Sequence, residues 1–370
     1  MNLTESHTAL ERELMAMIAT EGPLTVDRYM ALCLGHVRHG YYMRRDPFGR
    51  AGDFTTAPEI SQMFGELIGI WCLAAWQAMG TPWPLRLIEM GPGRGTLMSD
   101  LLRSTRVVPG FLEAARVDLV ETSPVLRQTQ NETLSRSGVT VQWHSRLADV
   151  PPGPTLLVAN EFFDALGVKQ FVRTDAGWHE RLVGIDASDK LTFGLAPDPL
   201  PLGVLPHWAQ AAVPGEVVEI SPARQEAAQA VGARLKAMGG ASLIIDYGHA
   251  HSAPGDTLQA VRAHAFQDVL DSPGESDLTS HVDFEALAAA LRSGGAKVHG
   301  PLTQGEFLSA MGLAERTEAL KRHAQAGTRI DIEAAATRLA AESQMGHLFK
   351  VIAATHPGLP PPYPFQEPRA

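Results

Sequence analysis

The sequence predicts an α/β protein built on a doubly wound core, in which helices cover both faces of a parallel sheet. Between residues 85 and 160, short apolar segments alternate with helical ones. Segments such as TLLVAN at 155–160 are apolar along nearly their whole length, as parallel strands buried on both faces are. The first of them ends in a glycine-rich turn that leads into a helix. These three observations favour a doubly wound sheet.

The period of the apolar residues predicts the individual elements. Helical segments at 5–35 and 58–76 precede the core. Residues 168–220 differ from the core, because segments such as VKQFVRT and WHERLVGI alternate apolar and polar side chains like antiparallel strands. The core elements are expected as strands at 85–90, 116–121, 139–144, 155–160, 242–248, 296–300 and 347–354, with helices at 96–103, 123–135, 221–239, 283–293 and from 306 to about 345.

These elements divide the chain into five segments. A break at the TPWP stretch ends the first one, and the change from uniformly apolar to alternating strands marks the next boundaries. The segments are a helical cover with a loop region (1–84), the first part of the core (85–167), a β-rich insertion (168–220), the remainder of the core with a helical insertion (221–355) and a Pro-rich tail (356–370).

The charge balance disfavours a nucleic-acid partner. The 370 residues contain 31 Lys and Arg against 41 Asp and Glu, which gives a formal net charge of −10. A chain with this excess of acid has no general basic surface for a phosphate backbone. A basic protein or peptide fits the balance better.

The sequence also lacks the usual signs of a metal site or a membrane span. Its two cysteines, Cys33 and Cys72, lie in apolar stretches outside any CxxC or Cys/His cluster. No apolar run reaches the roughly 18 residues needed to cross a bilayer. The polar first 15 residues lack the apolar centre of a signal peptide. We therefore expect a cytoplasmic protein without a metal, and its oligomeric state stays open.

The strongest local signal is the segment LIEMGPGRG at 87–95. Glu89 lies at the end of a strand, and Gly91, Gly93 and Gly95 follow before a helix. Glycines let the backbone turn sharply and approach a ligand, and the helix then presents free N–H groups to an anion. Dinucleotides usually bind to G-x-G-x-x-G, whereas G-x-G-x-G after a glutamate suits the methionine part of S-adenosylmethionine (SAM). A nucleotide site and a purely structural turn are the alternatives.

Two further strand ends supply candidate contacts to a cofactor. Glu121 ends the second strand, where a carboxylate can accept both hydroxyls of a ribose. The alternative there is a solvated acid. Leu147, after the third strand, is a candidate contact for an adenine ring.

The fourth strand leads into NEFFD at 160–164, at the edge where ligands of doubly wound sheets bind. Asn160, Glu161 and Asp164 are therefore candidates to face a cationic or hydrogen-bonding substrate, with simple solvation as the alternative. His281 precedes a later helix and is a further candidate. Its neighbours Ser280 and Asp283 could equally be helix caps.

Taken together, several segments resemble the MidA-like methyltransferases, SAM-dependent enzymes related to a mitochondrial complex I assembly factor that methylates arginine. The resemblance extends from about residue 20 to 355. One departure is Gly167, which stands where the family usually has proline, so the turn after the fourth strand is less constrained. The matching segments, in the family's order, are GYYMRRDPFGRAGDFTTAPEISQMFGE, LIEMGPGRGTLMSDLL, VETSPVLRQTQ, VANEFFDALGVKQF, LIIDYG, SPGESDLTSHVDF and SQMGHLFKVIAAT.

The resemblance implies a seven-stranded Rossmann-like core with an antiparallel last strand, a helical N-terminal cover and SAM as cofactor. It implies that Glu89 and the three glycines hold the methionine part of SAM and that Glu121 holds the ribose. Asn160 and Glu161 would lie near the sulfonium, and the stretch DFTTAPE, which contains Thr55, would fold over the cofactor. The implied substrate is a protein arginine, by analogy on a subunit of respiratory complex I.

We therefore expect in-line transfer of a methyl group to a guanidinium nitrogen. Arginine stays protonated and is a weak nucleophile, so a carboxylate that holds the guanidinium could localise its charge. Glu161 is the first candidate for this role and Asp164 the second, while His281 is a candidate acceptor of the released proton. The rival hypotheses are a non-catalytic SAM-binding assembly protein and an NAD-linked oxidoreductase.

Overall fold

The computed structural model describes residues 7–44, 55–201 and 203–366. The chain divides into two compact units. The larger one, called the core unit below, comprises Thr55–Phe163, Glu226–Ala250 and Val282–Ala370. The second unit comprises Met1–Phe54, Asp164–Gln225 and His251–His281. Each unit is therefore assembled from three separate stretches of the chain.

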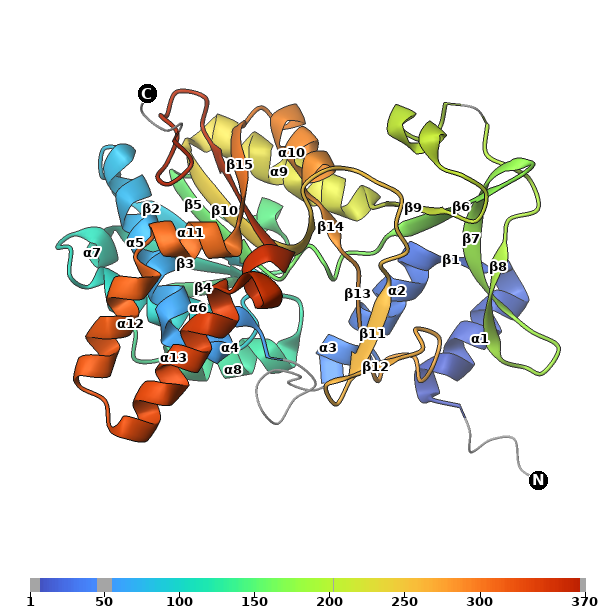
Figure 1. Ribbon diagram of the computed structural model, residues 1–370, viewed down its shortest axis with the longest axis horizontal. Coiled ribbons are helices and arrows are strands. Elements are labelled where there is room, and N and C mark those ends of the chain that lie inside the picture. Colours follow the sequence, from blue (N-terminus) through green and yellow to red (C-terminus); the bar gives the residue numbers. More distant parts are fainter. Residues whose placement is uncertain (1–6, 45–54, 202, 367–370) are drawn as a thin grey trace. The chain divides into compact units, whose positions relative to one another are not determined.

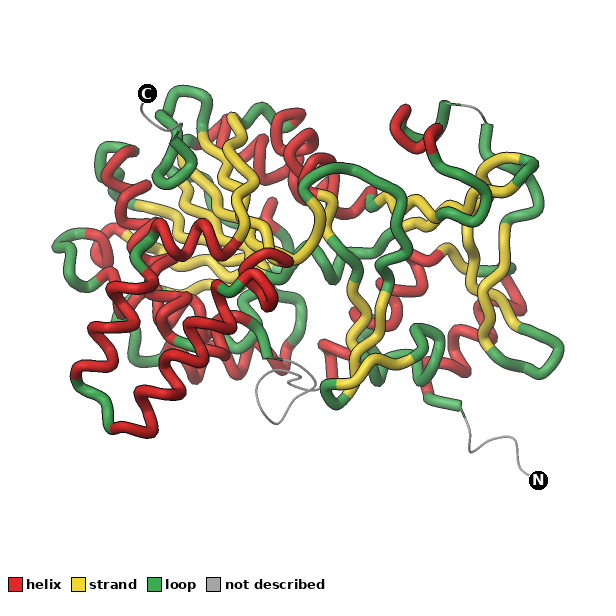
Figure 2. Tube along the Cα trace, viewed as in Figure 1, coloured by secondary structure: helices red, strands yellow, loops and turns green. Residues whose placement is uncertain are grey.

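The core unit contains the predicted sheet (Figures 1 and 2). Seven strands are hydrogen-bonded in the order β15-β16-β10-β5-β2-β3-β4, and the short β14 (Val282–Asp283) pairs with β10. Only β16 among these seven is antiparallel to its neighbours, which confirms the predicted seven-stranded core with an antiparallel last strand. The strands are β2 (Leu85–Met90), β3 (Ala115–Val120), β4 (Val141–His144), β5 (Thr155–Asn160), β10 (Gly240–His249), β15 (Lys297–Thr303) and β16 (Phe349–Thr355).

Helices cover both faces of this sheet because its strands bury side chains on both sides. Leu87 and Leu156 belong to the apolar cluster that the sheet shares with α5 and α6. Ile88 and Leu157, each one residue further along its strand, are fully buried as well and point to the opposite face. In Figure 1, α9 and α10 lie on the side of the sheet away from α5 and α6. The helices are α4 (Ala57–Ile60), α5 (Gln62–Ala78), α6 (Thr96–Thr105), α7 (Phe111–Ala114), α8 (Pro124–Leu134), α9 (Pro222–Met238) and α10 (Phe284–Ser293).

Two glycines bring α5 close to α6, the helix that follows the glycine-rich turn. A Cβ atom on Gly65 would lie 2.6 Å from the Cβ of Asp100, and one on Gly69 would lie 2.2 Å from the Oγ of Ser104. Neither distance leaves room for a side chain. The small residues at both positions therefore fix α6 against the helix that precedes the sheet.

The second unit contains the predicted β insertion. Strands β6 (Lys169–Thr174), β7 (Gly177–Ile185), β8 (Leu191–Leu195) and β9 (Val217–Ile220) pair in antiparallel fashion, as their alternating pattern predicts. Two features were not predicted: β1 (Leu24–Thr25) joins β7, and residues 259–279 form the small sheet β12-β11-β13. These strands are too short for a period to show in the sequence. The remaining elements are α1 (Ala9–Glu21), α2 (Val26–Gly35), α3 (Tyr41–Arg44), β11 (Gln259–Arg262), β12 (Ala265–Gln267) and β13 (Asp277–Thr279).

The helical segment predicted from 306 to about 345 is not continuous. It consists of α11 (Gln304–Ala310), α12 (Leu313–Arg322), α13 (Ala326–Ala340) and a π-helical turn at Glu342–Gly346. The first break falls at Gly312, whose φ of 94° lies in the left-handed region. No proline stands at this break, so neither a helix-breaking proline nor the apolar period predicted it.

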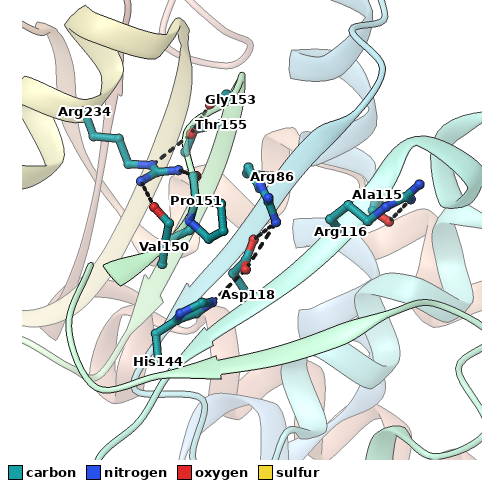
Figure 3. A network of polar contacts seen from close by, with 10 residues as sticks. All are labelled: Arg86, Ala115, Arg116, Asp118, His144, Val150, Pro151, Gly153, Thr155 and Arg234. Carbon is teal, nitrogen blue, oxygen red and sulfur yellow. Dashed lines mark hydrogen bonds and ion pairs between the residues drawn. The ribbon is translucent and has the colours of Figure 1, made fainter. Parts of the chain in front are cut away.

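A buried polar network connects β2, β3 and β4 (Figure 3). The side chain of Asp118 on β3 is fully buried. Its carboxylate pairs with the guanidinium of Arg86 on β2 at 3.2 Å and with Nε2 of His144 on β4 at 2.8 Å. The charge of Asp118 is therefore balanced across three neighbouring strands.

Replacing Asp118 by alanine is expected to destabilise the protein strongly. The change leaves Arg86 and His144 without their shared carboxylate, and the loss of one partner from a buried ion pair costs about 3–5 kcal/mol. Chemical denaturation should show the free energy of unfolding lowered by about this amount. The matched control is Asp331→Ala on the exposed surface of α13, which should change it by less than about 0.5 kcal/mol. Equal stability of D118A and the unmodified protein would contradict the structural role of this network.

Candidate active site

The carboxyl ends of neighbouring strands form one edge of the core sheet. The backbone N–H of Gly91 donates to the carbonyl of Val120 at 3.1 Å, which joins the turns after β2 and β3. The N–H of Glu161 donates to the carbonyl of Ile245 at 2.9 Å, which joins the turn after β5 to β10. Because β2 and β5 also pair directly, the candidate residues of the core unit gather along this edge.

The glycine turn has the backbone that its sequence predicts. Gly91, Gly93 and Gly95 have φ values of 65°, 51° and 80°, in the left-handed region that glycine adopts most easily. A Cβ on Gly91 would also lie 2.9 Å from the ring of Phe162. Gly95 occupies the N-cap position of α6 without a side-chain cap, so the first N–H groups of this helix are available to an anion.

Glu89 places a buried carboxyl group beside this turn. Its side chain is 2% exposed, and burial raises its pKa to about 8. Its Oε2 atom has no hydrogen-bond partner among the described residues. A buried, unsatisfied carboxyl oxygen is costly in a protein interior and is typical of a ligand site.

Asn160 presents a second unsatisfied oxygen, at the end of the neighbouring strand β5. Its side chain is 8% exposed, and Oδ1 finds no hydrogen-bond partner within the described part of the chain. Its Nδ2 donates to Oε1 of Glu161 at 3.1 Å. This bond orients the amide and leaves Oδ1 as an acceptor for another molecule.

These features fit SAM by the chemistry of their donor and acceptor groups. SAM carries an ammonium group and ribose hydroxyls, which donate hydrogen bonds to oxygens such as those of Glu89 and Asn160. Its carboxylate is an anion of the kind that the N–H groups at the start of α6 bind. The three glycines keep side chains away from the turn between these groups.

Glu121 is held in place by three hydrogen bonds at the end of β3. Its Oε1 accepts from the N–H groups of Thr122 and Ser123 at 2.7 and 2.8 Å, and its Oε2 accepts from Nε2 of Gln130 at 3.2 Å. Burial raises the pKa of Glu121, and these hydrogen bonds act in the opposite direction. The carboxylate that we expect to hold a ribose is thus fixed before any ligand arrives.

Gln130 is a site residue that the sequence analysis missed. It is fully buried on α8, and its Nε2 also donates to the carbonyl of Gly93 at 2.8 Å. It therefore connects the glycine turn to Glu121. One signal was present in the sequence: Gln130 lies between Leu126 and Leu134 on the apolar face of its helix.

Leu147 and Thr55 also belong to the core unit. Leu147 is 8% exposed and begins the 3₁₀ turn Leu147–Asp149 after β4. Thr55 is half-buried and directly precedes Thr56, the N-cap residue of α4. Asp53 and Phe54, the first residues of the expected cofactor-covering stretch, lie outside the described residues. The cofactor contacts of Leu147 and Thr55 stay predictions.

Glu161 has a strained backbone and an oriented side chain. Its φ of 50° is unusual for a residue other than glycine, and such strain costs on the order of 1–3 kcal/mol and is concentrated at functional sites. Its Oε1 accepts hydrogen bonds from the N–H of Ala57 at 3.0 Å and from Asn160. Glu161 thus connects the turn after β5 to α4.

Asp164 and His281 belong to the second unit, whereas Glu161 belongs to the core unit. Within the second unit, one residue holds the backbone of both. The guanidinium of Arg224 donates to the carbonyl of Asp164 at 3.1 Å and to that of His281 at 2.6 Å. The structure therefore brings Asp164 and His281 together through Arg224, a residue that the sequence analysis did not single out.

The described ranges are residues 7–44, 55–201 and 203–366. No group of three or more His, Cys, Asp or Glu side chains in these ranges could hold a metal ion. In the same ranges, no helix is long and apolar enough to cross a membrane.

Comparison with known proteins identifies the class of this enzyme. Residues 67–302 match the model of a family described as "Putative S-adenosyl-L-methionine-dependent methyltransferase". A solved structure from Burkholderia thailandensis, bound to S-adenosyl-homocysteine, is similar with a TM-score of 0.82 and 30% identity, over 94% of this chain and 92% of that one. The protein is a SAM-dependent methyltransferase with SAM as its cofactor.

Two curated relatives define the family more closely. The chain is 39% identical to "Protein arginine methyltransferase NDUFAF7, mitochondrial" of Xenopus tropicalis, over 85% of this chain and 78% of the relative. It is 38% identical to the Drosophila melanogaster homologue, over 94% of this chain and 85% of the relative. The chain belongs to the MidA-like methyltransferase family that its motifs resemble. Neither rival hypothesis, an NAD-linked oxidoreductase or a non-catalytic binding protein, has support among these relatives.

One sequence-based prediction is corrected by the comparison. We expected a cytoplasmic protein from the polar amino terminus, but the curated relatives from Xenopus tropicalis, Drosophila melanogaster and Mus musculus are mitochondrial proteins. The cytoplasmic prediction is therefore contradicted. It rested on the absence of a recognisable leader pattern, which is weak evidence on the compartment of a protein.

The predicted role of Glu89 makes SAM affinity depend on pH. With a pKa of about 8, against an ordinary value of 4.5, Glu89 keeps its proton at neutral pH in the folded protein. The folded state thus binds this proton more tightly than the unfolded state, so the contribution of Glu89 to stability falls as pH rises from 4.5 to about 8. An ammonium group beside Glu89 favours the ionised carboxylate, so SAM binding should release a proton.

We therefore expect the Kd for SAM to fall as pH rises from about 6 to about 7.5, by up to about tenfold per pH unit. Calorimetric titration in buffers of different ionisation enthalpy should show the released proton. Glu89→Gln should bind SAM more weakly and without this pH dependence. A Kd of the unmodified protein that stays constant across this range would exclude Glu89 as the group that meets the ammonium.

Proposed function

We propose that this enzyme transfers a methyl group from SAM to an arginine side chain of a protein. Its curated relatives at 38–39% identity are named protein arginine methyltransferases. The observation that carries the proposal is the polar edge of the core sheet, where Glu89, Asn160 and Glu161 lie buried or oriented beside the glycine turn. By analogy with the family, we propose a respiratory complex I-type subunit as the target.

In this proposal, different residues of the core unit bind different parts of the cofactor. Glu89 and the turn Gly91, Gly93 and Gly95 hold the methionine part, and Glu121 holds the ribose. Leu147 contacts the adenine, and Asn160 and Thr55 lie against the remainder of the cofactor. When bound, SAM supplies a methyl group on a positively charged sulfur, which is a good leaving group. The protein's main task is therefore alignment of the acceptor.

The acceptor is a guanidinium whose charge is delocalised over three nitrogens. A carboxylate that receives two of its N–H groups orients it and draws the charge away from the third nitrogen. We assign this role first to Glu161 and second to Asp164. His281 is proposed to take the proton that the methylated nitrogen releases.

Substitution of Gly93 tests the cofactor site directly. Gly93 has a φ of 51°, which a β-branched residue adopts only with strain. Gly93→Val should therefore abolish calorimetrically detectable binding of SAM and S-adenosylhomocysteine, while NAD should bind neither protein. Gly138→Ala, at a turn that also has positive φ but open space around it, is the matched control and should bind SAM normally. Normal SAM binding by G93V would place the cofactor elsewhere.

Glu161→Gln separates binding from turnover. Glutamine keeps an oxygen that can accept from Ala57 and Asn160, but it loses the negative charge. We expect a Kd for SAM close to that of the unmodified protein, and incorporation of labelled methyl groups into an arginine-containing protein fraction lowered by about a hundredfold. Unchanged incorporation would remove Glu161 from the acceptor side. Absence of transfer by the unmodified protein into any fraction would favour a non-catalytic role.

A further inference from the structure

Residues 55–60, called the linking segment below, connect two parts of the cofactor edge. The segment comprises Thr55, Thr56 and the four-residue helix α4. Isolated helices of this length do not persist in water, and the side chain of Thr56 at the N-cap does not cap the helix with a hydrogen bond. The position of the segment therefore depends on its contacts with the rest of the core unit.

One contact lies at the start of α4. The N–H of Ala57, which is fully buried, donates to Oε1 of Glu161 at 3.0 Å. The same oxygen accepts from Asn160 at 3.1 Å. The first turn of α4 is thereby tied to the turn after β5.

A second contact lies two residues further along the chain and reaches the glycine turn. Oε1 of Glu59 accepts a hydrogen bond from the hydroxyl of Thr96, the first residue of α6. Its Oε2 lies 3.5 Å from the guanidinium of Arg94, which stands between Gly93 and Gly95. The Glu59 side chain is 15% exposed and that of Arg94 is 40% exposed, so water screens this ion pair only in part.

We propose that Glu59 is a positioning residue for the cofactor and that it acts through Thr96 and Arg94 on the glycine turn. Three glycines give this turn large conformational freedom in the absence of other contacts. A turn that is held in its binding conformation beforehand binds a ligand without the cost of ordering. The inference rests on the proposed assignment of this turn to the methionine part of SAM. Glu59 ends the stretch DFTTAPE that is expected to cover the cofactor, but its side chain was given no role of its own there.

The contacts of the linking segment also predict that two substitutions of Glu161 have different effects on SAM affinity. Glu161→Gln keeps an oxygen for the N–H of Ala57, whereas Glu161→Ala removes it. Loss of the segment's anchor at either end should weaken binding in the same way. E161A should therefore lose SAM affinity together with E59A, while E161Q should not.

The test measures the Kd for S-adenosylhomocysteine by calorimetry, so that no methyl acceptor is needed. Glu59→Ala should weaken binding by about tenfold, the effect of losing one hydrogen bond to a charged group. Thr96→Val should weaken it by a smaller factor. The double variant should bind as weakly as E59A alone, because both changes break the same contact. Glu333→Ala, on the exposed surface of α13, is the matched control and should bind normally.

Circular dichroism and thermal melts of the same variants establish whether each one is folded. If E59A is not folded, T96V still tests the proposal, because valine is nearly isosteric with threonine. A Kd of E59A or T96V equal to that of the unmodified protein would overturn the positioning role. The positioning role would also be overturned if the loss of binding free energy in the double variant equalled the sum of the losses in the two single variants. Failure of the proposed cofactor site gives a different result, in which G93V binds S-adenosylhomocysteine normally.

Discussion

The parallel pairing of β2 with β3 on one side and with β5 on the other is the constraint on which the core unit depends. Strands that run in one direction end at one edge, so the turns that follow them emerge together. The strands are apolar because helices cover both faces. Glu89 and Asn160 lie at or next to the carboxyl ends of β2 and β5, so they are buried by their position rather than by any preference of their own.

Asp118 and Glu89, two buried carboxyl groups of the same sheet, differ in whether the protein supplies partners for their oxygens. Asp118 meets the guanidinium of Arg86 and the imidazole of His144 on adjacent strands, which satisfy its carboxylate. Glu89 lies 2% exposed with one oxygen unsatisfied among the described residues, and its pKa is raised by burial alone. A folded protein tolerates such a group when enough stability comes from elsewhere, and it keeps one where a ligand supplies the missing partner. We therefore expect Asp118 to have a structural role and Glu89 to bind a ligand.

The sequence predicted the seven-stranded core with its antiparallel last strand, the antiparallel insertion and the glycine turn, because each depends on local composition or on an ordered set of motifs. It did not reveal Gln130 or Glu59 as site residues, since their roles depend on which oxygen lies opposite them after folding. Gln130 was at least visible as a polar residue on an apolar helix face. The assembly of the second unit from three stretches could not be read locally, because no period or composition records which distant segments pair.

That discontinuous assembly has a consequence for the order of events during synthesis. Thr8 donates its hydroxyl proton to the carbonyl of Pro273, and Tyr29 donates to that of Val269. These two contacts of the amino-terminal helices can thus form only after at least 240 further residues have been made. At about 5–20 residues per second on the ribosome, this interval lasts on the order of ten seconds or longer. Until then the apolar faces of α1 and α2 cannot pack against the complete core of the second unit. We expect the chain to depend most on a chaperone during this period.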